Sequence, residues 1–519
     1  MPDGQTLFSP TRTRSPLLGD AGAVLLIIVA AALLRMTSFI PAVVDTDEGL
    51  YLVQAREWLR GGWPLVVAWD MHPIGAPMMF ALAFLGFGVS VEAVRLLGMI
   101  CVAATGCALY GAARAAGAPR RIGIGAAVIY AAQSVLLGGL CTNTELLIAP
   151  FIAGAMAIAV RGAARAGGPS PAAPGWPSLV AAGLLVGWAL VIKQVVVPEG
   201  CLVFVVLLLP ALARGVLPWR RALLMAAAYA VLCALPFLAW GFVYWTRGWL
   251  DQYLDGSLMA PFRYSMERIE GAEAARRIGT AALQLGVPFA AALVAVAAWR
   301  PRWMPGSVVV LTGAAVLWFA VASAAIAGPG FFFAHYFLLW LPPLSLLAAI
   351  GAWWLTRLVA RPAALRGAFA GIIAVIAVQA WLVEASGRLE HGPGLMHRDP
   401  AREVAAAVRE AAGPGGDAFI ANYHPSVYVI ADVRLSTRFP FPAHLTGEFE
   451  DLSDTNTEVE LDRVLAARPR AIVVDRGWMH TMRPAAAEKV MAAVSAGYDL
   501  FATVEEGRGP VEIYRARLR

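Results

Sequence analysis

Long apolar runs, separated by short polar segments, dominate the chain as far as residue 386. Most runs have close to the ~20 residues that a helix needs to cross the hydrocarbon core of a bilayer. They lie at about 21–40, 91–115, 122–140, 145–165, 178–194, 196–213, 222–246, 277–299, 306–327, 335–356 and 365–386. The pattern predicts a polytopic α-helical membrane protein with about eleven spans.

The arginines in the loops predict how these helices are oriented. Cytoplasmic loops carry an excess of Lys and Arg, and with a cytoplasmic N-terminus the alternate loops fit this rule. They contain Arg12, Arg14, Arg114, Arg120, Arg121, Arg161, Arg165, Arg214, Arg220, Arg221, Arg300, Arg302, Arg357, Arg361 and Arg366. Residues 75–89 are short for a crossing, and counting them as one would move Arg120 and Arg121 outside, so we interpret them as a re-entrant or interfacial helix. Residues 1–20 are then a cytoplasmic tail.

The hydrophobic pattern changes from about residue 387. We expect a linker at 387–394 and, over 395–519, an alternation of helices and strands. Helices are expected at 401–412, 461–467 and 484–494, and strands at 418–421, 471–475, 499–504 and 511–514. This alternation predicts a small α/β domain with its own core. With an odd number of spans, we expect this domain on the outer side of the membrane.

Composition excludes a soluble protein. Of 519 residues, 59% are hydrophobic and only 15% are charged, and the mean hydropathy is +0.66. A soluble domain of this size needs more charge on its surface. The net charge of +6 comes from the loop arginines and does not indicate a nucleic-acid partner. The sequence has no GxxxxGK[ST] phosphate loop and no dinucleotide fingerprint, so it gives no sign of a nucleotide-driven pump.

The loop after the first apolar run contains an unusual number of ionisable residues. It reads DTDEGLYLVQAREWLRGGWPLVVAWDMHPIGAP over 45–77, with Asp45, Asp47 and Glu48 close together and Asp70 and His72 further on. Carboxylates beside lipid are expensive and usually pair, bind or catalyse. The orientation rule also places the later polar turns around 141–145, 193–199, 247–275 and 328–336 on this outer face. Their convergence predicts an active site at the outer membrane surface.

The first loop resembles that of the GT-C superfamily of polyprenyl-phosphate-sugar glycosyltransferases. The nearest relatives by this pattern are bacterial members of the protein O-mannosyltransferase-like family, which includes the aminoarabinose transferase that acts on lipid A. The matching residues are Asp47, Glu48, Tyr51, Gly61, Asp70, Pro73, Gly75 and Pro77. His72 stands where the family has Lys, and Ile74 where it has a second Pro. Because His is largely neutral at pH 7, residue 72 differs from the family in charge.

Three later motifs follow in the family's order: NTE at 143–145, KQ at 193–194, and HYF…LPP at 335–343, with Leu339 in place of a usual Gln. The resemblance covers about residues 20–386 and implies a GT-C catalytic domain at 21–386, with the first external loop at 41–90. The implied activity is an inverting transfer of a hexose or pentose in the bacterial inner membrane.

The resemblance implies that Asp47 is the general base. A hydroxyl or amine that attacks the anomeric carbon needs a proton acceptor opposite the leaving phosphate, and one base without a nucleophile inverts the sugar. Glu48 and Glu145 complete the predicted catalytic set. Structural alternatives stay open, because Asp45 and Glu48 have the spacing of a capping box and Glu145 opens a helix after Asn143.

Cations at the outer face are candidates for holding the departing lipid phosphate, which leaves more easily when its charge is stabilised. The candidates are Lys193, His335, His72 and Arg263. Alternatively, the Lys193 side chain extends to the membrane interface, and His335 has only a structural role. Supporting roles are predicted for Asp45, Tyr51, Asp70, Tyr336 and Arg95. For Arg95 we expect a structural ion pair with Glu92 or with an acid of the first loop.

Asp47, Glu48, His72 and His335 are also residue types that bind divalent metals, but the resemblance favours a metal-independent enzyme, so no cofactor is predicted.

The expected partners are a polyprenyl-phosphate sugar donor, membrane lipid, and a glycan, lipid or protein acceptor. Two other classes stay open: a transporter or flippase of a lipid-linked saccharide, and a non-catalytic scaffold. The acids gather in one outer loop and no duplicated halves are visible, which favours an enzyme over a transporter.

Overall fold

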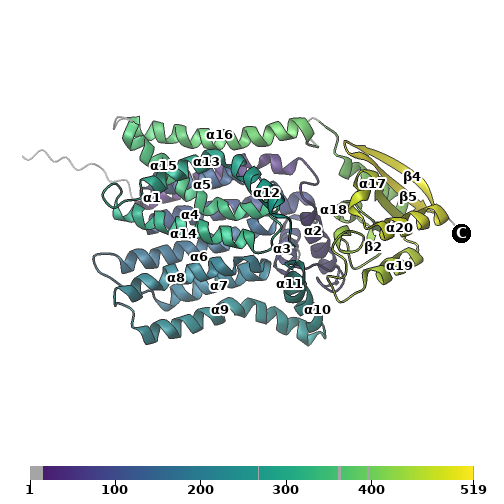
Figure 1. Ribbon diagram of the computed structural model, residues 1–519, viewed down its shortest axis with the longest axis horizontal. Helices are drawn as coiled ribbons and strands as arrows, with labels where there is room; N and C mark the ends of the chain where they lie inside the picture. Colours follow the sequence, from purple (N-terminus) through teal and green to yellow (C-terminus); the bar gives the residue numbers. More distant parts are fainter. Residues whose placement is uncertain (1–15, 267, 360–363, 394–396, 518–519) are drawn as a thin grey trace, which may run out of the picture.

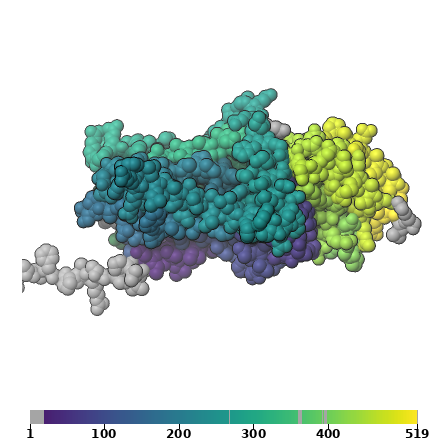
Figure 2. All heavy atoms as spheres, turned by 90° about the horizontal axis from the view of Figure 1, so that it is seen from below, coloured from purple at the N-terminus to yellow at the C-terminus, as the bar shows by residue number. Residues whose placement is uncertain are grey.

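The protein consists of a long bundle of helices with a smaller α/β domain at one end (Figure 1). The computed structural model describes residues 16–266, 268–359, 364–393 and 397–517. Arg12 and Arg14 of the expected N-terminal tail lie outside these residues. In the space-filling view of Figure 2, the α/β domain caps the end of the bundle.

The bundle is formed by helices α1 to α16. Their bounds are α1 Pro16–Leu34, α2 Thr46–Leu59, α3 Gly75–Phe87, α4 Val91–Ala115, α5 Arg120–Gln133, α6 Thr144–Ala166, α7 Trp176–Ile192, α8 Val197–Ala213, α9 Trp219–Thr246, α10 Leu250–Leu254, α11 Ala260–Tyr264, α12 Gly271–Gln284, α13 Gly286–Ala297, α14 Gly306–Ala327, α15 Leu341–Val359 and α16 Leu365–His391. Short helical turns include η1 Met36–Phe39, η2 Gln194–Val196, η3 Asp255–Met259 and η4 Ala334–Trp340.

Seven helices within the described ranges are long and apolar enough to cross a bilayer, so the polytopic helical fold is confirmed. They are α4, α6, α8 with η2, α9, α14, α15 with η4, and α16. The pair α12–α13, bent by 83°, would make an eighth span. Helices α1, α3 and α7 are apolar but shorter. The expected total of eleven spans therefore stays a prediction.

Small residues let neighbouring helices of the bundle approach closely. A Cβ atom on Gly351 of α15 would lie 1.8 Å from the carbonyl oxygen of Ala291 in α13. Close backbone contact of this kind supplies the van der Waals packing that holds membrane helices together, because lipid provides no hydrophobic driving force between them.

The C-terminal domain is a five-stranded mixed sheet with helices around it. Its elements are α17 Pro400–Ala412, β1 Asp417–Ile420, α18 Ser426–Ala431, β2 Arg434–Leu435, η6 Pro442–His444, α19 Thr457–Ala467, β3 Ala471–Asp475, η7 Arg476–Thr481, α20 Pro484–Gly497, β4 Tyr498–Glu506 and β5 Gly509–Ala516. The strand order is β2-β1-β3-β5-β4, with β1 parallel to β2 and β3, and β5 antiparallel to β3 and β4. The predicted strands and helices are all present, whereas α18 and β2 are additions.

Helix α16 continues to His391. Residues 387–391 of the expected linker are therefore part of this helix, which continues beyond its apolar stretch.

The first loop docks tightly onto the C-terminal domain. Helices α2 and α18 pack together, and a Cβ atom on Gly49 would lie 2.7 Å from the backbone nitrogen of Ser426. The buried Arg56 of α2 donates hydrogen bonds to the carbonyl oxygens of Tyr428 and Val433 at the end of α18. These buried contacts hold the domain against the loop that carries the predicted site.

Candidate active site

Helix α2 begins at the acids of the first loop. Asp45 is its N-cap, in an extended conformation, and its Oδ1 accepts a hydrogen bond of 3.0 Å from the backbone N–H of Asp47. Capping of this kind satisfies one of the free N–H groups at a helix start. Asp47 therefore sits in the first helical turn, where its side chain is held by the helix and turned towards the residues described below.

His335 of η4 lies between the two aspartates. Its Nδ1 is 3.2 Å from Asp45 Oδ2, and its Nε2 is 3.8 Å from Asp47 Oδ2. Burial disfavours the ionised form of Asp45, but the neighbouring His335 outweighs it and lowers the pKa of Asp45 to about 2. For Asp47, burial and the negative charge of Asp45 raise the pKa to about 6. The pair thus combines a firmly ionised carboxylate with one that titrates near neutrality.

A second cation enters the site at the end of α7. Lys193 follows the last residue of this helix and is buried, with its Nζ 2.7 Å from Glu145 Oε1 at the start of α6. The same Nζ lies 4.5 Å from the centre of the Tyr336 ring, a distance that allows a cation–π contact. Lys193 is therefore held inside the protein near His335, and does not reach to solvent.

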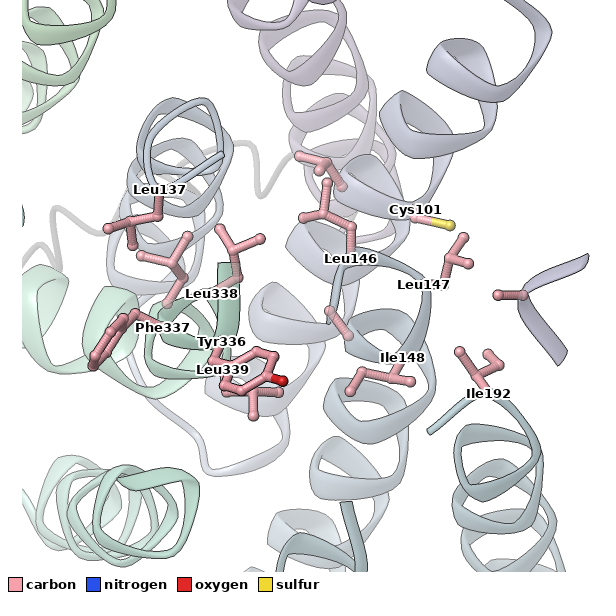
Figure 3. Close-up of a cluster of buried hydrophobic side chains, with 14 of the residues drawn as sticks. Cys101, Leu137, Leu146, Leu147, Ile148, Ile192, Tyr336, Phe337, Leu338 and Leu339 are labelled. Carbon is pink, nitrogen blue, oxygen red and sulfur yellow. The ribbon is translucent and has the colours of Figure 1, made fainter. Parts of the chain in front are cut away.

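The two aspartates, His335, Lys193 and Tyr336 line one cavity of about 390 Å³. Its lining includes Asp45, Asp47, Tyr51, Asp70, His72, Lys193, Tyr264, Phe333, His335, Tyr336, Phe441, His444 and Glu448. The first loop, η4, α11 and the C-terminal domain all contribute to it. Figure 3 shows buried side chains of α6 and η4, the two elements that carry Glu145 and His335, with Leu146, Ile148 and Leu339 among them. Close packing of these side chains fixes the positions of the two elements.

His72 occupies the position where the resembling family has Lys. Its Nδ1 lies 3.1 Å from both carboxylate oxygens of Asp70, and its ring meets that of Tyr51 edge-on at 6.1 Å. Burial opposes ionisation of Asp70, but His72 outweighs it and lowers the pKa of that carboxyl. Three predicted residues, Asp70, His72 and Tyr51, therefore meet in the cavity wall.

Four predicted site residues lie outside the cavity lining: Glu48, Arg95, Arg263 and Glu145. Glu48 points away from Asp47 and forms a buried ion pair, with its Oε2 2.5 Å from Nη2 of Arg95 and its Oε1 accepting from the N–H of Thr142 at 2.6 Å. In this structure Glu48 therefore binds Arg95 and the backbone of Thr142, away from the cavity lining. The expected pairing of Arg95 with an acid of the first loop is confirmed.

Arg263 also lies outside the cavity lining. Its Nη2 lies 2.6 Å from Asp255 Oδ1, and its Nε donates to the carbonyl oxygen of Leu452 at 2.8 Å. This arginine joins α11 to the C-terminal domain, so the structure does not support a phosphate-binding role. Glu145 also lies outside the lining, behind Lys193, where it holds the lysine in place.

Sequence reasoning missed the residues that the C-terminal domain contributes. His444 is buried against Trp69 and Phe441, and neither of its ring nitrogens has a hydrogen-bond partner among the described residues. Burial lowers the pKa of His444 to about 4, so its imidazole is neutral at pH 7. Glu448 is a second polar residue that this domain contributes to the cavity lining. His444 ends the three-residue helical turn η6 and Glu448 lies four residues after it. A segment this short has no hydrophobic periodicity, so no sequence signal marks the two residues.

The cavity also contains a set of possible metal ligands. One ligand atom each from Asp45, Asp47 and His335 lie within 4.8 Å of one another. Two carboxylates and an imidazole suit a divalent cation. This set differs from the one considered from the sequence, since it includes Asp45 and lacks Glu48 and His72. The absence of a cofactor stays a prediction.

The fold and cavity define a class: polytopic helical membrane proteins whose first loop joins a C-terminal domain around a buried acidic and basic pocket. Among solved structures, the chain is similar to ArnT from Cupriavidus metallidurans in the apo state, with a TM-score of 0.61, 16% identity, and 96% of this chain and 98% of that chain covered. It is also similar to ArnT from the same organism bound to undecaprenyl phosphate, with a TM-score of 0.59 and 14% identity; 95% of this chain and 98% of that chain are covered.

A third similar structure is the archaeal oligosaccharyltransferase AglB from Archaeoglobus fulgidus in complex with an inhibitory peptide and a dolichol-phosphate. Its TM-score is 0.54 and its identity 13%, and the match covers 97% of this chain and 75% of that chain. No family model matches the chain, and no curated protein does. These likenesses show that the chain shares its fold with the ArnT and AglB structures.

Proposed function

We propose that this protein is an inverting glycosyltransferase that moves a sugar from a polyprenyl-phosphate donor to an acceptor. The observation that carries the proposal is the single cavity in which Asp47, with its raised pKa, faces the buried cations Lys193 and His335. Structures with the same fold hold undecaprenyl phosphate in ArnT and a dolichol-phosphate in AglB, which supports a lipid phosphate as the donor's carrier.

The proposed reaction is a direct displacement. An acceptor hydroxyl or amine gives its proton to the Asp47 carboxylate and forms a bond to the anomeric carbon. The bond from that carbon to the phosphate oxygen breaks, and the oxygen keeps the electron pair. Lys193 and His335 stabilise the negative charge of the departing phosphate, while Glu145 and Asp45 hold these two cations in position.

We place the site at the periplasmic side of the bacterial inner membrane, because the loop arginines predict a cytoplasmic N-terminus. The donor's isoprenoid chain then lies in the bilayer and its phosphate at the outer surface.

The proposal is tested by incubating the purified protein in lipid nanodiscs with radiolabelled polyprenyl-phosphate sugars. Release of free polyprenyl phosphate together with a labelled product or free sugar is the expected result. Transbilayer movement of the intact donor, without cleavage of its sugar–phosphate bond, would instead identify a flippase.

The rate of transfer should depend on pH through Asp47. A general base acts only when deprotonated, so we expect kcat to fall as the pH drops below about 6, the raised pKa of Asp47. Asp45→Asn removes the negative charge beside it and should move this fall to lower pH. The measurement is kcat against pH for both proteins, and an unshifted profile would assign the titrating group elsewhere.

Removing the Lys193 charge should weaken donor binding. Because Glu145 would be left buried and unpaired, the double variant Lys193→Met/Glu145→Gln is compared with Glu145→Gln alone. We expect the donor KM to rise about 10-fold to 100-fold, as for loss of one charge-assisted hydrogen bond. An unchanged donor KM would exclude Lys193 from phosphate binding.

A further inference from the structure

A second, larger hollow opens beside the catalytic cavity. It has a volume of about 630 Å³ and is formed mainly by the C-terminal domain, with Thr46 and Phe333 from the membrane part. Phe333, Phe441, Ala443 and Glu448 line both spaces, so the two adjoin. We call the larger hollow the C-terminal groove. A molecule lying in it would reach the catalytic cavity past Glu448.

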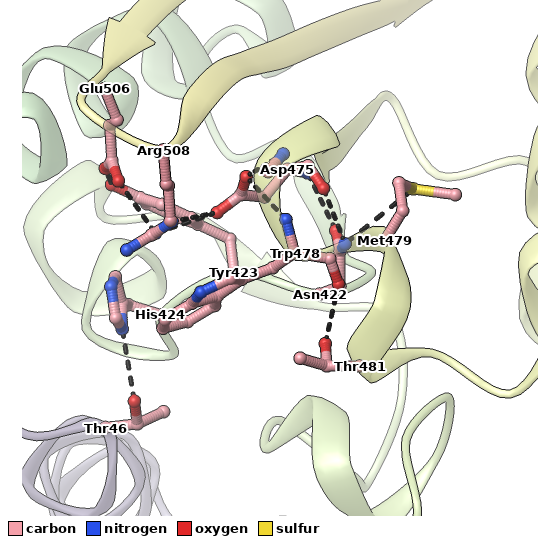
Figure 4. Close-up of polar contacts among 11 residues, drawn as sticks. Thr46, Asn422, Tyr423, His424, Asp475, Trp478, Met479, Thr481, Glu506 and Arg508 are labelled. Atoms are coloured by element: carbon pink, nitrogen blue, oxygen red, sulfur yellow. Dashed lines mark hydrogen bonds and ion pairs between the residues drawn. The ribbon is translucent and has the colours of Figure 1, made fainter.

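A tryptophan with a fixed ring lines this groove. Arg508 lies over the Trp478 ring at 3.7 Å from its centre, and the His424 ring meets it edge-on at 5.1 Å (Figure 4). Asp475 stabilises this arrangement, since it accepts hydrogen bonds from the backbone N–H of Trp478 and from Arg508. Gly477 is required here because a Cβ atom would lie 2.6 Å from the carbonyl oxygen of Arg508.

The groove carries no unpaired arginine or lysine among its described lining residues. Arg483 forms ion pairs of 2.8 Å with Glu450 and 2.7 Å with Glu458, and it also donates to the carbonyl oxygen of Gly447. Glu448, in contrast, is exposed and has no ion-pair partner among the described residues. A phosphorylated ligand would meet an uncompensated carboxylate and no free guanidinium or ammonium group.

We infer that the C-terminal groove binds the acceptor and that this acceptor is an uncharged saccharide chain, an inference that rests on the proposed transferase function. The apolar C–H face of a sugar ring packs against a rigid aromatic ring such as Trp478. The Glu448 carboxylate accepts hydrogen bonds from sugar hydroxyls at the passage to the catalytic cavity. The chain's terminal hydroxyl then points towards Asp47.

Binding of acceptor analogues to the full chain in nanodiscs, without donor, tests this inference. The probes are neutral oligosaccharides of mannose, glucose, galactose or N-acetylglucosamine, a phosphorylated disaccharide and an uncharged hexapeptide, followed by saturation-transfer NMR. We expect a neutral oligosaccharide to bind, and Trp478→Ala to raise its dissociation constant about tenfold or more. Trp478→Phe, which keeps an aromatic face, should retain most of the affinity, and Glu448→Gln should weaken it.

The matched control is Trp219→Ala, which removes an exposed tryptophan at the start of α9 and should leave binding unchanged. The inference is overturned if no neutral oligosaccharide binds, if only the phosphorylated disaccharide or the peptide binds, or if neither Trp478→Ala nor Glu448→Gln alters binding. Because no donor is present, this binding measurement does not depend on sugar transfer. Saccharide binding here, together with no cleavage of the donor in the transfer assay with radiolabelled polyprenyl-phosphate sugars, would refute the transferase proposal and leave the groove as a saccharide-binding site.

Discussion

Asp47→Asn is expected to lower kcat for sugar transfer by about 10²–10⁴-fold, the usual contribution of a positioned general base. Asparagine has nearly the same shape but accepts no proton. The acceptor hydroxyl or amine would then have to attack while it still carries its proton. Donor binding should change little, because Lys193 and His335 remain in the cavity. The measurement is initial rate against donor and acceptor concentration for the purified variant in nanodiscs.

The matched control is Asp251→Asn, the same chemical change at an exposed aspartate of α10, and it should retain full activity. If Asp47→Asn transferred sugar at the unaltered rate, Asp47 would have no part in the mechanism and the base would have to be sought among other groups of the cavity.

Arg95→Met should destabilise the protein severely. Arg95 and Glu48 are both almost completely buried, and removing one partner of a buried ion pair typically costs about 3–5 kcal/mol because the other charge is left uncompensated. We expect poor yield and a markedly lower midpoint of thermal unfolding, measured by the loss of monodisperse protein on heating in detergent.

Arg402→Met provides the comparison, because Arg402 pairs with Glu92 at 2.7 Å on the surface. Exposed pairs contribute only about 0–1 kcal/mol, so this variant should unfold near the unaltered midpoint. Should Arg95→Met fold normally and yet lose transfer activity, the Arg95–Glu48 pair would have to be reassigned from structure to catalysis.

Much of the membrane part follows from local sequence. Apolar runs of sufficient length can only be satisfied as helices in lipid, and the strands of the C-terminal domain show as short apolar runs such as the fully buried Ala471–Asp475. The association of Asp47 with His335 was also predictable, because the arginine pattern put both residues on the same face. What the pattern did not distinguish was the direction of neighbouring side chains.

Glu48 illustrates this limit. It follows Asp47 directly, but successive residues on a helix point about 100° apart, so one faces the cavity and the other faces Arg95. Arg263 was expected on the same side of the bundle as the first loop. Its partner Leu452 lies in another domain, and no spacing along the chain predicts such a contact.

The contribution of the C-terminal domain was not predictable from the sequence. His444 and Glu448 reach the cavity only because Arg56 and Gly49 dock this domain onto α2. Contacts between segments that are hundreds of residues apart depend on tertiary packing, and the irregular segment around Pro442 shows no periodicity to suggest them. The C-terminal groove beside Trp478 is likewise formed by tertiary packing of distant segments, so the sequence pattern did not predict it.

The central claim is that Asp47, Lys193 and His335 act on one lipid-linked sugar within one cavity. It is tested most directly by the electron cryomicroscopy structure of the Asp47→Asn variant with a polyprenyl-phosphate sugar bound. We predict a phosphate within hydrogen-bonding distance of Lys193, and a sugar whose anomeric carbon faces residue 47. A phosphate bound outside this cavity, with residue 47 out of contact with the sugar, would contradict the account.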